Sequence, residues 1–520
     1  MSRFLLLPFL TIVLLTQPST EHNILGLFPH FGFSHFKVFY PVLRGLAENG
    51  HNITVITYIK NPQPHPNYNE LLLSGESIVN VFMLDHFTAT RSLPVMIEEY
   101  FALHNEGQKS CEQFYQSGFV EEVLERHASN PYDLVITEFF NTDCYQGLPY
   151  LLQLPVVGLS SCALMPWYYD RILLPDNPAY IQSEFIGFPE ELNWHERLVN
   201  FLQGRLIKLL YRYHTNRMDS KIIKNYLKID VDVYEYTKIS TSLVFVNQHY
   251  SLSGNRPATP QLIEIGGIHI DEREINKTLQ SNLEEFLDNS PNGVLFISWG
   301  SMLRGSSFPP SKLQAILKVL QNLSLRIVWK WEEDKIPFES KQFLFIKWAP
   351  QLTLLCHPKV KLFWGHGGLL GVTEAVYCGK PLILTPIYGD QFLNAHAIEN
   401  RKIGKIMHYD EIEESRLGSL LQEVARPRSL SEIFRKRETT PLQTTLWWIE
   451  HLLRHGKTAS DLLRTKAVSL NWFVYYSLDS VALLLVFSAV MLLVVMWLLR
   501  AACFLLRSKP PQQSHKEKKS

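Results

Sequence analysis

The feature that most constrains this chain is a nineteen-residue apolar run near its C-terminus. Val481 to Leu499 contains no charged residue, and Asp479 and Arg500 flank it. A helix of this length crosses the hydrocarbon core of a bilayer. Basic residues follow the run, so the positive-inside bias places residues 501–520 in the cytosol and everything before the run in the lumen. The sequence therefore predicts a transmembrane helix at 480–500 that follows a large lumenal part.

The N-terminus agrees with this orientation. Residues 1–20 contain Arg3, an apolar run from Phe4 to Leu15 and then small polar residues, the pattern of a secretory signal peptide. Lys516 and Lys518 have the spacing of a dilysine retrieval signal, with a merely solvated basic tail as the alternative. The prediction is a single-pass type I protein of the endoplasmic reticulum membrane.

Composition narrows the function. The 50 basic residues are balanced by 50 acidic residues, so no basic surface favours nucleic acid as a partner. Six cysteines without a C-x-x-C pair exclude a metal cluster and a disulfide framework, leaving one lumenal disulfide of unknown pairing. N-glycosylation sequons stand at Asn52, Asn276 and Asn322.

The lumenal part repeats one local pattern. Short apolar runs such as "NILGLF" (23–28), "NITVITY" (52–58) and "DLVIT" (133–137) are separated by intervals long enough for helical crossovers. A stretch rich in glycine and proline (251–262) follows, and the pattern restarts with "GVLFISWG". We expect two α/β domains, 21–250 and 263–470, facing a cleft, with ligands at the carboxyl ends of the strands.

One of these strand ends has unusual chemistry. "FWGHGGLLGVTEA" (363–375) leads from a strand into His366 among glycines and then into a helix. Bare backbone N–H groups and the helix dipole favour an anion there, although a glycine-rich crossover with a structural histidine would look the same. Glu374 follows Gly368 by about 9 Å of helix, a suitable distance for the hydroxyls of a ribose.

Two neighbouring segments extend this site. "KWAPQ" offers Trp348 as a stacking surface and Gln351 as an amide, and "YGDQ" offers Asp390 and Gln391 at the end of the next strand. Taken singly, Trp348 is more often a core residue and Asp390 a helix N-cap. Taken in this order, the groups fit one elongated ligand: base, ribose, diphosphate and sugar.

The run from Trp348 to Gln391 closely resembles the signature of the UDP-glycosyltransferase family, in the membrane-bound animal branch that includes the UDP-glucuronosyltransferases. The resemblance extends over nearly the whole chain, and "FNTDC" and "IEIGGIHI" look like arthropod members. It implies a GT-B fold of two Rossmann-like domains, with the acceptor bound by the first domain and the UDP-sugar by the second.

The resemblance also implies roles for individual residues. Those expected to hold the UDP-sugar are Trp348, Gln351 and Glu374 for the nucleoside, Ser301, His366 and Gly368 for the diphosphate, and Asp390 and Gln391 for the sugar. Gly365 and Leu370 depart from the family, which usually has polar residues at these two positions.

The base implied by the resemblance is His35 in "PHFGFSHF", since an acceptor hydroxyl must lose its proton as it attacks. The family orients this base with an aspartate. Two residues are candidates for this acid. Glu138 stands at the end of a strand, but nearby Asp143 has the family's type of side chain, so we favour Asp143. No metal is expected, and we interpret the pair Asp230 and Asp232 as a solvated loop.

The predicted reaction transfers glucuronic acid or glucose from a UDP-sugar to hydroxyl groups of small lipophilic acceptors, with inversion, for detoxification or hormone inactivation. UDP-glucuronate or UDP-glucose is a co-substrate, and no cofactor is implied. The alternative is a catalytically silent type I membrane protein that binds small apolar ligands. Either protein is compatible with self-association into a homo-oligomer.

Overall fold

The computed structural model describes residues 21–75, 84, 92–185, 187–423 and 428–507. The predicted signal peptide and the end of the basic tail, with Lys516 and Lys518, lie outside the described residues. The chain divides into two compact units, one ending at Arg464 and the other beginning at Thr465.

The first domain is built on a parallel seven-stranded sheet of order β3-β2-β1-β4-β5-β6-β7. Its strands are β1 (Asn23–Phe28), β2 (Asn52–Thr57), β3 (Tyr68–Leu72), β4 (Leu134–Glu138), β5 (Val156–Ser160), β6 (Thr241–Val246) and β7 (Leu262–Glu264). The central strands are buried along their whole length, because helices cover both faces of a parallel sheet.

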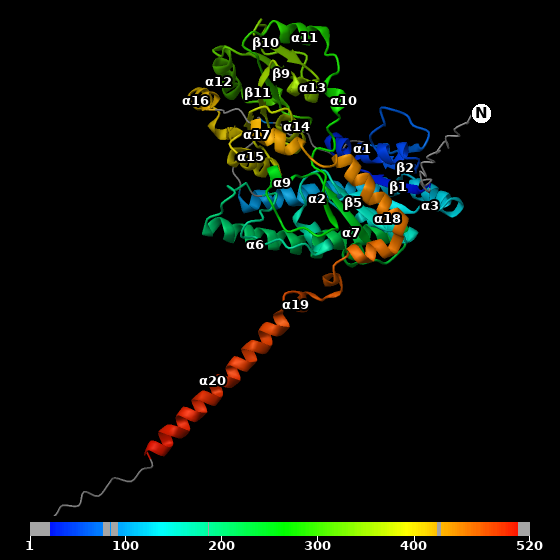
Figure 1. The fold of residues 1–520 in the computed structure, drawn as a ribbon, viewed down its shortest axis with the longest axis vertical. Coiled ribbons are helices and arrows are strands. Elements are labelled where there is room, and N and C mark those ends of the chain that lie inside the picture. The colour runs from blue at the N-terminus through cyan, green and yellow to red at the C-terminus, as the bar shows by residue number, and fades with distance from the viewer. Residues whose placement is uncertain (1–20, 76–83, 85–91, 186, 424–427, 508–520) are drawn as a thin grey trace, which may run out of the picture. The chain divides into compact units, whose positions relative to one another are not determined.

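The second domain repeats this design with a parallel six-stranded sheet of order β10-β9-β8-β11-β12-β13. Its strands are β8 (Val294–Ser298), β9 (Arg326–Lys330), β10 (Phe343–Ile346), β11 (Val360–Gly365), β12 (Leu382–Leu384) and β13 (Gly404–Ile406). Both domains therefore have the Rossmann-like architecture that the sequence predicts (Figure 1).

Helices fill the intervals between the strands. In the first domain they are α1 (Phe33–Glu48), α2 (Leu93–Gln116), α3 (Phe119–Ser129), α4 (Gly147–Leu152), α5 (Tyr169–Ile172), α6 (Trp194–Leu210), α7 (Asn216–Leu227), α8 (Val233–Ser240) and α9 (Tyr250–Ser253). In the second they are α10 (Glu272–Ile275), α11 (Ser281–Asp288), α12 (Pro310–Gln321), α13 (Gln351–Cys356), α14 (Leu369–Tyr377), α15 (Gln391–Asn400), α16 (Glu414–Glu423) and α17 (Arg428–Arg435).

Two segments that follow the expected domain boundary pack on the first domain. Strand β7 begins at the last residue of the predicted linker 251–262 and continues into the predicted second domain, yet it pairs with β6 and completes the first sheet. Helix α18 (Pro441–Leu463), broken at Gly456, returns to the first domain, where Ile449 and Leu452 join the apolar cluster under α1 (Figure 1). The range 263–470 therefore includes two elements that pack on the first sheet, because β6 and α1 leave apolar surface that only these later segments cover.

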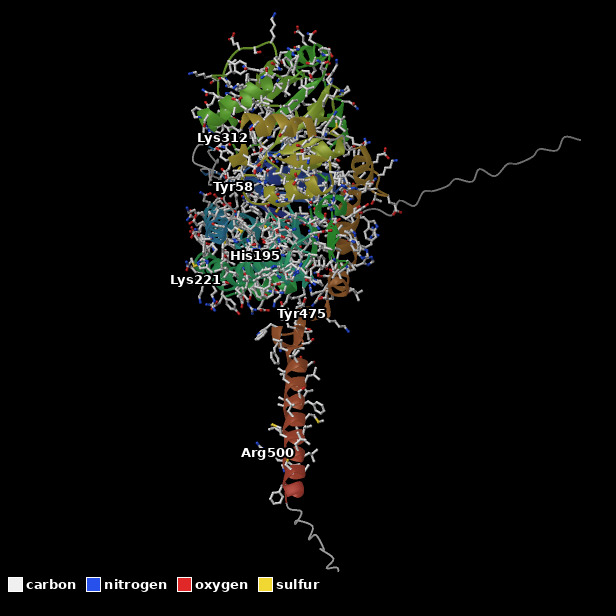
Figure 2. The ribbon with its side chains drawn as sticks, turned by 90° about the vertical axis from the view of Figure 1, so that its left-hand side faces the viewer. Tyr58, His195, Lys221, Lys312, Tyr475 and Arg500 are labelled. Carbon is white, nitrogen blue, oxygen red and sulfur yellow. A yellow bond between two sulfur atoms is a disulfide. The ribbon has the colours of Figure 1, made fainter. Side chains whose placement is uncertain are left out.

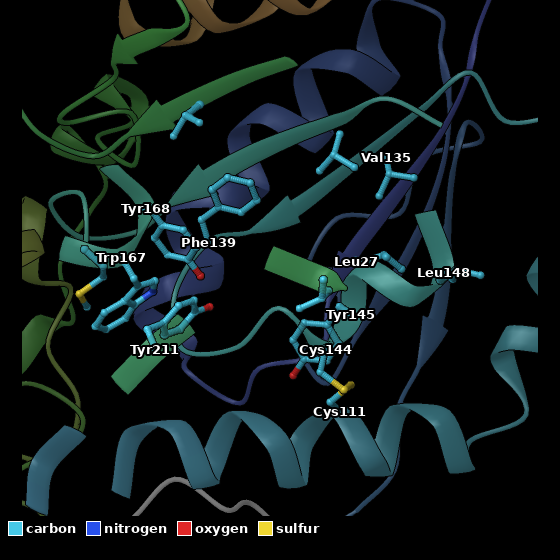
Figure 3. Packing of buried hydrophobic residues seen from close by; sticks show 14 of the residues in the cluster. Leu27, Cys111, Val135, Phe139, Cys144, Tyr145, Leu148, Trp167, Tyr168 and Tyr211 are labelled. Atoms are coloured by element: carbon cyan, nitrogen blue, oxygen red, sulfur yellow. A yellow bond between two sulfur atoms is a disulfide. The ribbon is translucent and has the colours of Figure 1, made fainter. Parts of the chain in front are cut away.

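The first domain has a second apolar cluster, rich in aromatic residues and separate from the one under α1 (Figure 3). Trp167 stacks on Tyr211 with ring centroids 4.9 Å apart, and the disulfide Cys111–Cys144 ties α2 to the loop after β4. A second disulfide joins Cys356 to Cys378 in the second domain. The expectation of one disulfide was wrong, because the spacing along the chain does not tell which helices become neighbours.

The second unit contains α19 (Trp472–Tyr475) and α20 (Leu478–Arg507). Its segment Leu478–Phe504, 27 residues long, is long and apolar enough to cross a membrane. Figure 2 shows apolar side chains along α20 and Arg500 within the helix. The helix thus continues past the predicted span 480–500 into the first residues of the expected tail, since no glycine or proline stands between Arg500 and Arg507.

Candidate active site

Each sheet has one point where the strand order reverses, and each point carries predicted site residues. In the first sheet this point lies between β1 and β4. His35 lies in the first turn of α1, the helix after β1, and Glu138 is the last residue of β4. In the second sheet it lies between β8 and β11, which precede Ser301 and His366. Ligands of open parallel sheets bind at such switch points. Here both open onto one cavity of about 800 Å³ lined by the two domains.

The first-domain side of the cavity holds a hydrogen-bonded histidine. His35 Nδ1 lies 2.5 Å from Glu138 Oε1 and 2.8 Å from Ser161 Oγ, and Ser161 donates to the same carboxylate at 3.3 Å. Burial alone would raise the pKa of Glu138, but His35, His30 and Ser161 together hold it below its usual value. An ionised carboxylate at Nδ1 requires a proton there, which leaves Nε2 as the basic nitrogen.

The preference for Asp143 as the orienting acid is contradicted by this geometry. Asp143 is buried and forms an ion pair with Arg171, and its second oxygen accepts a hydrogen bond from Asn216 at 2.8 Å. It does not line the cavity among the described residues, and Glu138 takes the place beside His35. Glu138 is the partner of His35 because β4 ends beside the first turn of α1. Asp143 lies five residues further along, in the loop after β4.

The second-domain side explains the histidine set among glycines. A Cβ on Gly368 would come within 2.5 Å of His366 Nε2, and one on Gly300 within 2.6 Å of its Cε1. The ring therefore lies between two backbone segments that must be bare. Desolvation, with Lys330 nearby, lowers the pKa of His366 to about 4. His366 is thus neutral, and positive charge for an anion comes from the start of α14 and from Lys330.

The two departures from the family have packing reasons. A Cβ added to Gly365 would meet Phe363 at 2.8 Å, so the site has no room for a hydroxyl-bearing side chain unless Phe363 moves. Leu370 packs against the apolar cluster of the first domain that contains α1 residues. Both positions therefore serve packing in this chain, and an anion at the predicted site would meet backbone N–H groups, Ser301 and His366.

Glu374 forms the centre of a network that joins the domains. Its Oε2 accepts a hydrogen bond from Gln351 at 2.7 Å, and its Oε1 accepts one from Lys37 of α1 at 2.9 Å. His269 Nε2 lies 3.7 Å from the same oxygen. Burial would raise the pKa of Glu374, but Lys37, His269 and Gln351 hold it below its usual value. The predicted ribose acid is therefore an ionised, buried acceptor.

The remaining predicted residues also line the cavity. Trp348 is 65% exposed, so its ring is available for stacking and is not a core residue. Asp390 stands at the N-cap of α15 without capping it, and its Oδ2 accepts a hydrogen bond from Asn394 at 3.0 Å. Burial raises the pKa of Asp390, against the effects of Asn394 and His35, so Asp390 and His35 are electrostatically coupled across the cavity. Gln391 uses its carbonyl to accept from the N–H of Ile387 at 2.9 Å.

Sequence reasoning missed three residues of this site. Ser161 directly follows β5, so its strand-end position was a usable signal. Lys330 ends β9, where its Nζ donates to Gly300 O at 2.7 Å. Lys37 carried no such signal, because nothing in α1 indicates that its side chain reaches a helix more than 300 residues later.

The structure also locates the groups that resemble metal ligands. Asp232 caps α8 and Asp230 pairs with Lys224, so both have structural partners, as expected of a loop pair. The ligand atoms of His30, His35 and Glu138 lie within 4.8 Å of one another, close enough for a cation. Glu138 and Nδ1 of His35 already bind each other there.

Two Rossmann-like domains whose switch points share one cavity define the GT-B class of glycosyltransferases. Solved structures agree: a UDP-glucosyltransferase from Polygonum tinctorium capable of glucosylating indoxyl is 15% identical over 84% of this chain and 99% of its own, with a TM-score of 0.53. The calicheamicin glycosyltransferase CalG4 is 16% identical over 85% and 98%, with a TM-score of 0.51.

The chain belongs to the UDP-glucoronosyl and UDP-glucosyl transferase family, whose model matches residues 30–509. It is 32% identical to UDP-glycosyltransferase UGT5 of Dactylopius coccus, over 94% of this chain and 93% of that one. It is 28% identical to human UDP-glucuronosyltransferase 1A6, over 87% and 86%. The protein is therefore a UDP-glycosyltransferase, and the described residues contain one helix long and apolar enough to cross a membrane.

Proposed function

We propose that this enzyme transfers glucose or glucuronic acid from its UDP-sugar to hydroxyl groups of small lipophilic acceptors, by metal-independent inverting displacement. The observation that carries the proposal is the facing pair in one cavity: His35, held by Glu138, on the first domain, and the start of α14 with His366 on the second. A base and an anion site on opposite walls suit an acceptor on one side and a UDP leaving group on the other.

The mechanism follows from these positions. His35 Nε2 takes the proton of the acceptor hydroxyl, while Glu138 stabilises the imidazolium that forms. The acceptor oxygen forms a bond to the anomeric carbon as the bond to the UDP oxygen breaks on the opposite face, which inverts the configuration. The leaving diphosphate is stabilised by the N-terminus of α14, by Ser301 and by Lys330. Trp348, Gln351 and Glu374 hold the nucleoside, and Asp390 and Gln391 the sugar.

The cellular setting belongs to the same proposal. We assign the catalytic unit to the lumen of the endoplasmic reticulum, anchored by α20, and the physiological role to detoxification or hormone inactivation. An anchored cavity with an apolar wall is well placed for acceptors that partition into lipid.

The test is a conjugation assay on membranes that contain the full chain. We expect product from a panel of phenols with UDP-glucose or UDP-glucuronate, equal activity in chelator, and a β-linked product from the α-linked donor. Retained binding of phenols without any conjugate, with either donor, would favour the alternative of a catalytically silent carrier.

Replacing the orienting acid tests the assignment of Glu138. Glu138→Gln keeps the shape but removes the charge that fixes the tautomer of His35, so we expect kcat to fall by about a hundredfold with an unchanged KM for the donor. The matched control is Asp143→Asn, which should lower stability and leave kcat of the folded enzyme within about threefold, since that side chain does not reach the cavity. The reverse ranking of the two kcat values would restore Asp143 as the orienting acid.

The pH dependence of donor binding tests the role of Glu374. Its lowered pKa keeps the carboxylate ionised at neutral pH, and protonation as the pH falls removes the acceptors for the ribose. Lys37→Met removes a cation that lowers this pKa, so UDP binding should begin to weaken at a higher pH than in the wild type. Titration calorimetry with UDP at decreasing pH measures this shift.

Lys277→Met is the control for Lys37→Met. Lys277 also lines the cavity, but it is exposed and pairs with Glu274 at 3.0 Å. Its removal should leave the pH profile unchanged. Superimposable profiles for the wild type and both variants would show that Glu374 does not govern donor binding.

A further inference from the structure

Glu184 is a buried acid that the mechanism above does not use. It lies between α5 and α6, lines the cavity and is 3% exposed. Neither carboxyl oxygen has an N–H or O–H donor within hydrogen-bond distance in the described part of the chain, and its neighbour is the weakly donating thiol of Cys162. Burial, together with the charge of Asp390, raises the pKa of Glu184 well above its usual value, against smaller effects of Arg256 and of the weakly donating Cys162 thiol.

An unpartnered carboxyl of this kind weakens the fold. A buried polar group without a partner lowers the stability of the fold, and native structures contain few of them. Arg256 does not relieve the cost, because its guanidinium hydrogen-bonds Tyr169 and Ser253. A group that gives the fold no hydrogen bond and faces a cavity is explained by a ligand that supplies the missing partner.

The surrounding wall indicates what this ligand is. The first-domain wall of the cavity contains, besides Glu184, apolar side chains, among them Leu103, Phe140, Met165 and Phe185. It also contains the acids Glu98, Glu99 and Glu106 of α2. Among the described first-domain residues that line the cavity, Lys37 is the one lysine and there is no arginine, and Lys37 binds Glu374. This wall suits an apolar ligand that donates hydrogen bonds and repels one that carries a carboxylate.

The position of Glu184 relates it to the acceptor. Its neighbour Cys162 directly follows Ser161, which hydrogen-bonds the base His35. An acceptor whose hydroxyl reaches His35 therefore extends along the wall that contains Glu184.

We propose that Glu184 is a specificity-determining residue for the acceptor: it binds a hydrogen-bond donor, a second hydroxyl or a protonated amine, on the non-reacting part of an apolar acceptor and excludes acceptors that carry a carboxylate. This inference rests on the proposed transferase function. It adds the chemical class of the acceptor, which neither the family nor the site residues above define.

A matched set of naphthols tests the proposal. The four members carry hydrogen, hydroxymethyl, aminomethyl or carboxylate on the second ring, and KM is measured with the full-length enzyme in membranes. For the wild type we expect hydroxymethyl and aminomethyl to lower KM about tenfold relative to hydrogen, and carboxylate to raise it by a similar factor.

The variants separate the possible roles of the side chain. In Glu184→Leu the three substituted naphthols should approach the unsubstituted one, whose own KM stays unchanged. Glu184→Gln should retain the preference for hydroxymethyl and lose the preference for aminomethyl. Because no N–H or O–H donor of the described residues binds Glu184, neither variant should lower the melting temperature. Glu98→Gln, an exposed acid on the same wall, is the control and should leave the preferences for hydroxymethyl and aminomethyl unchanged.

Three results would overturn the proposal. The first is unchanged substituent preferences in Glu184→Leu. The second is an equal rise of the donor KM with all four acceptors, which would assign Glu184 to the sugar. The third is a lower melting temperature in both variants, which would make the role of Glu184 structural. Equilibrium binding of the same naphthols in the presence of UDP separates this inference from the function. If no naphthol is conjugated but the binding preferences and their loss in Glu184→Leu appear, the transferase proposal fails and the role of Glu184 stands.

Discussion

Replacing His35 with alanine is expected to lower kcat at least a hundredfold while UDP binds as tightly as before. General-base catalysis contributes about 10²- to 10⁴-fold, and among the described residues His35 is the one imidazole hydrogen-bonded to Glu138. The donor groups lie on the second domain, so the loss should appear in kcat and not in the affinity for UDP. Steady-state kinetics with a phenol and calorimetry with UDP measure the two quantities.

His30 offers the control for this variant. Its ring stacks on His35 at 4.7 Å, but burial, with His35 nearby, lowers its pKa to about 4, and its Nδ1 accepts a hydrogen bond from Gly32 N. His30→Ala removes a neighbouring ring without removing the base, so most of the activity should remain. Turnover of His35→Ala at the wild-type rate would refute the assignment of the base, whatever the control shows.

Replacing Arg171 with methionine should cost about 3–5 kcal/mol of unfolding free energy, because it leaves the carboxylate of Asp143 buried without its cation. Arg171 is 2% exposed, and its guanidinium lies 4.2 Å from the ring centroid of Tyr168. Urea denaturation of the detergent-solubilised protein, followed by tryptophan fluorescence, measures the loss.

Two further variants define the cause of this loss. Lys224→Met breaks an exposed ion pair with Asp230 and should cost less than about 1 kcal/mol. Arg171→Met combined with Asp143→Leu removes both charges and should recover part of the stability. A single variant as stable as the wild type would mean that the buried pair does not stabilise the first domain.

Much of the fold could be predicted because its signals are local. Apolar runs followed by glycine, histidine or acidic residues indicate strands and their carboxyl ends, and parallel sheets bring those ends to one edge. For that reason nine of the predicted site residues line the cavity: His35, Ser301, Trp348, Gln351, His366, Gly368, Glu374, Asp390 and Gln391.

The predictions that failed depended on distant neighbours. Asp143 has the family's side chain, but only the packing of Arg171 and Asn216 around it shows that it belongs to the first domain's interior. The two disulfides and the return of α18 to the first sheet likewise depend on which elements meet after folding.

The sequence by itself thus determined the apolar span, the parallel α/β class and the chemistry at each strand end, because each is encoded within a few neighbouring residues. Only the tertiary structure decided that Glu138 hydrogen-bonds His35, that Lys37 of α1 reaches Glu374 of α14, and that Glu184 lines the cavity without an N–H or O–H donor among the described residues. These are contacts between segments far apart in the chain, and their geometry arises only when the two domains pack around a shared cavity.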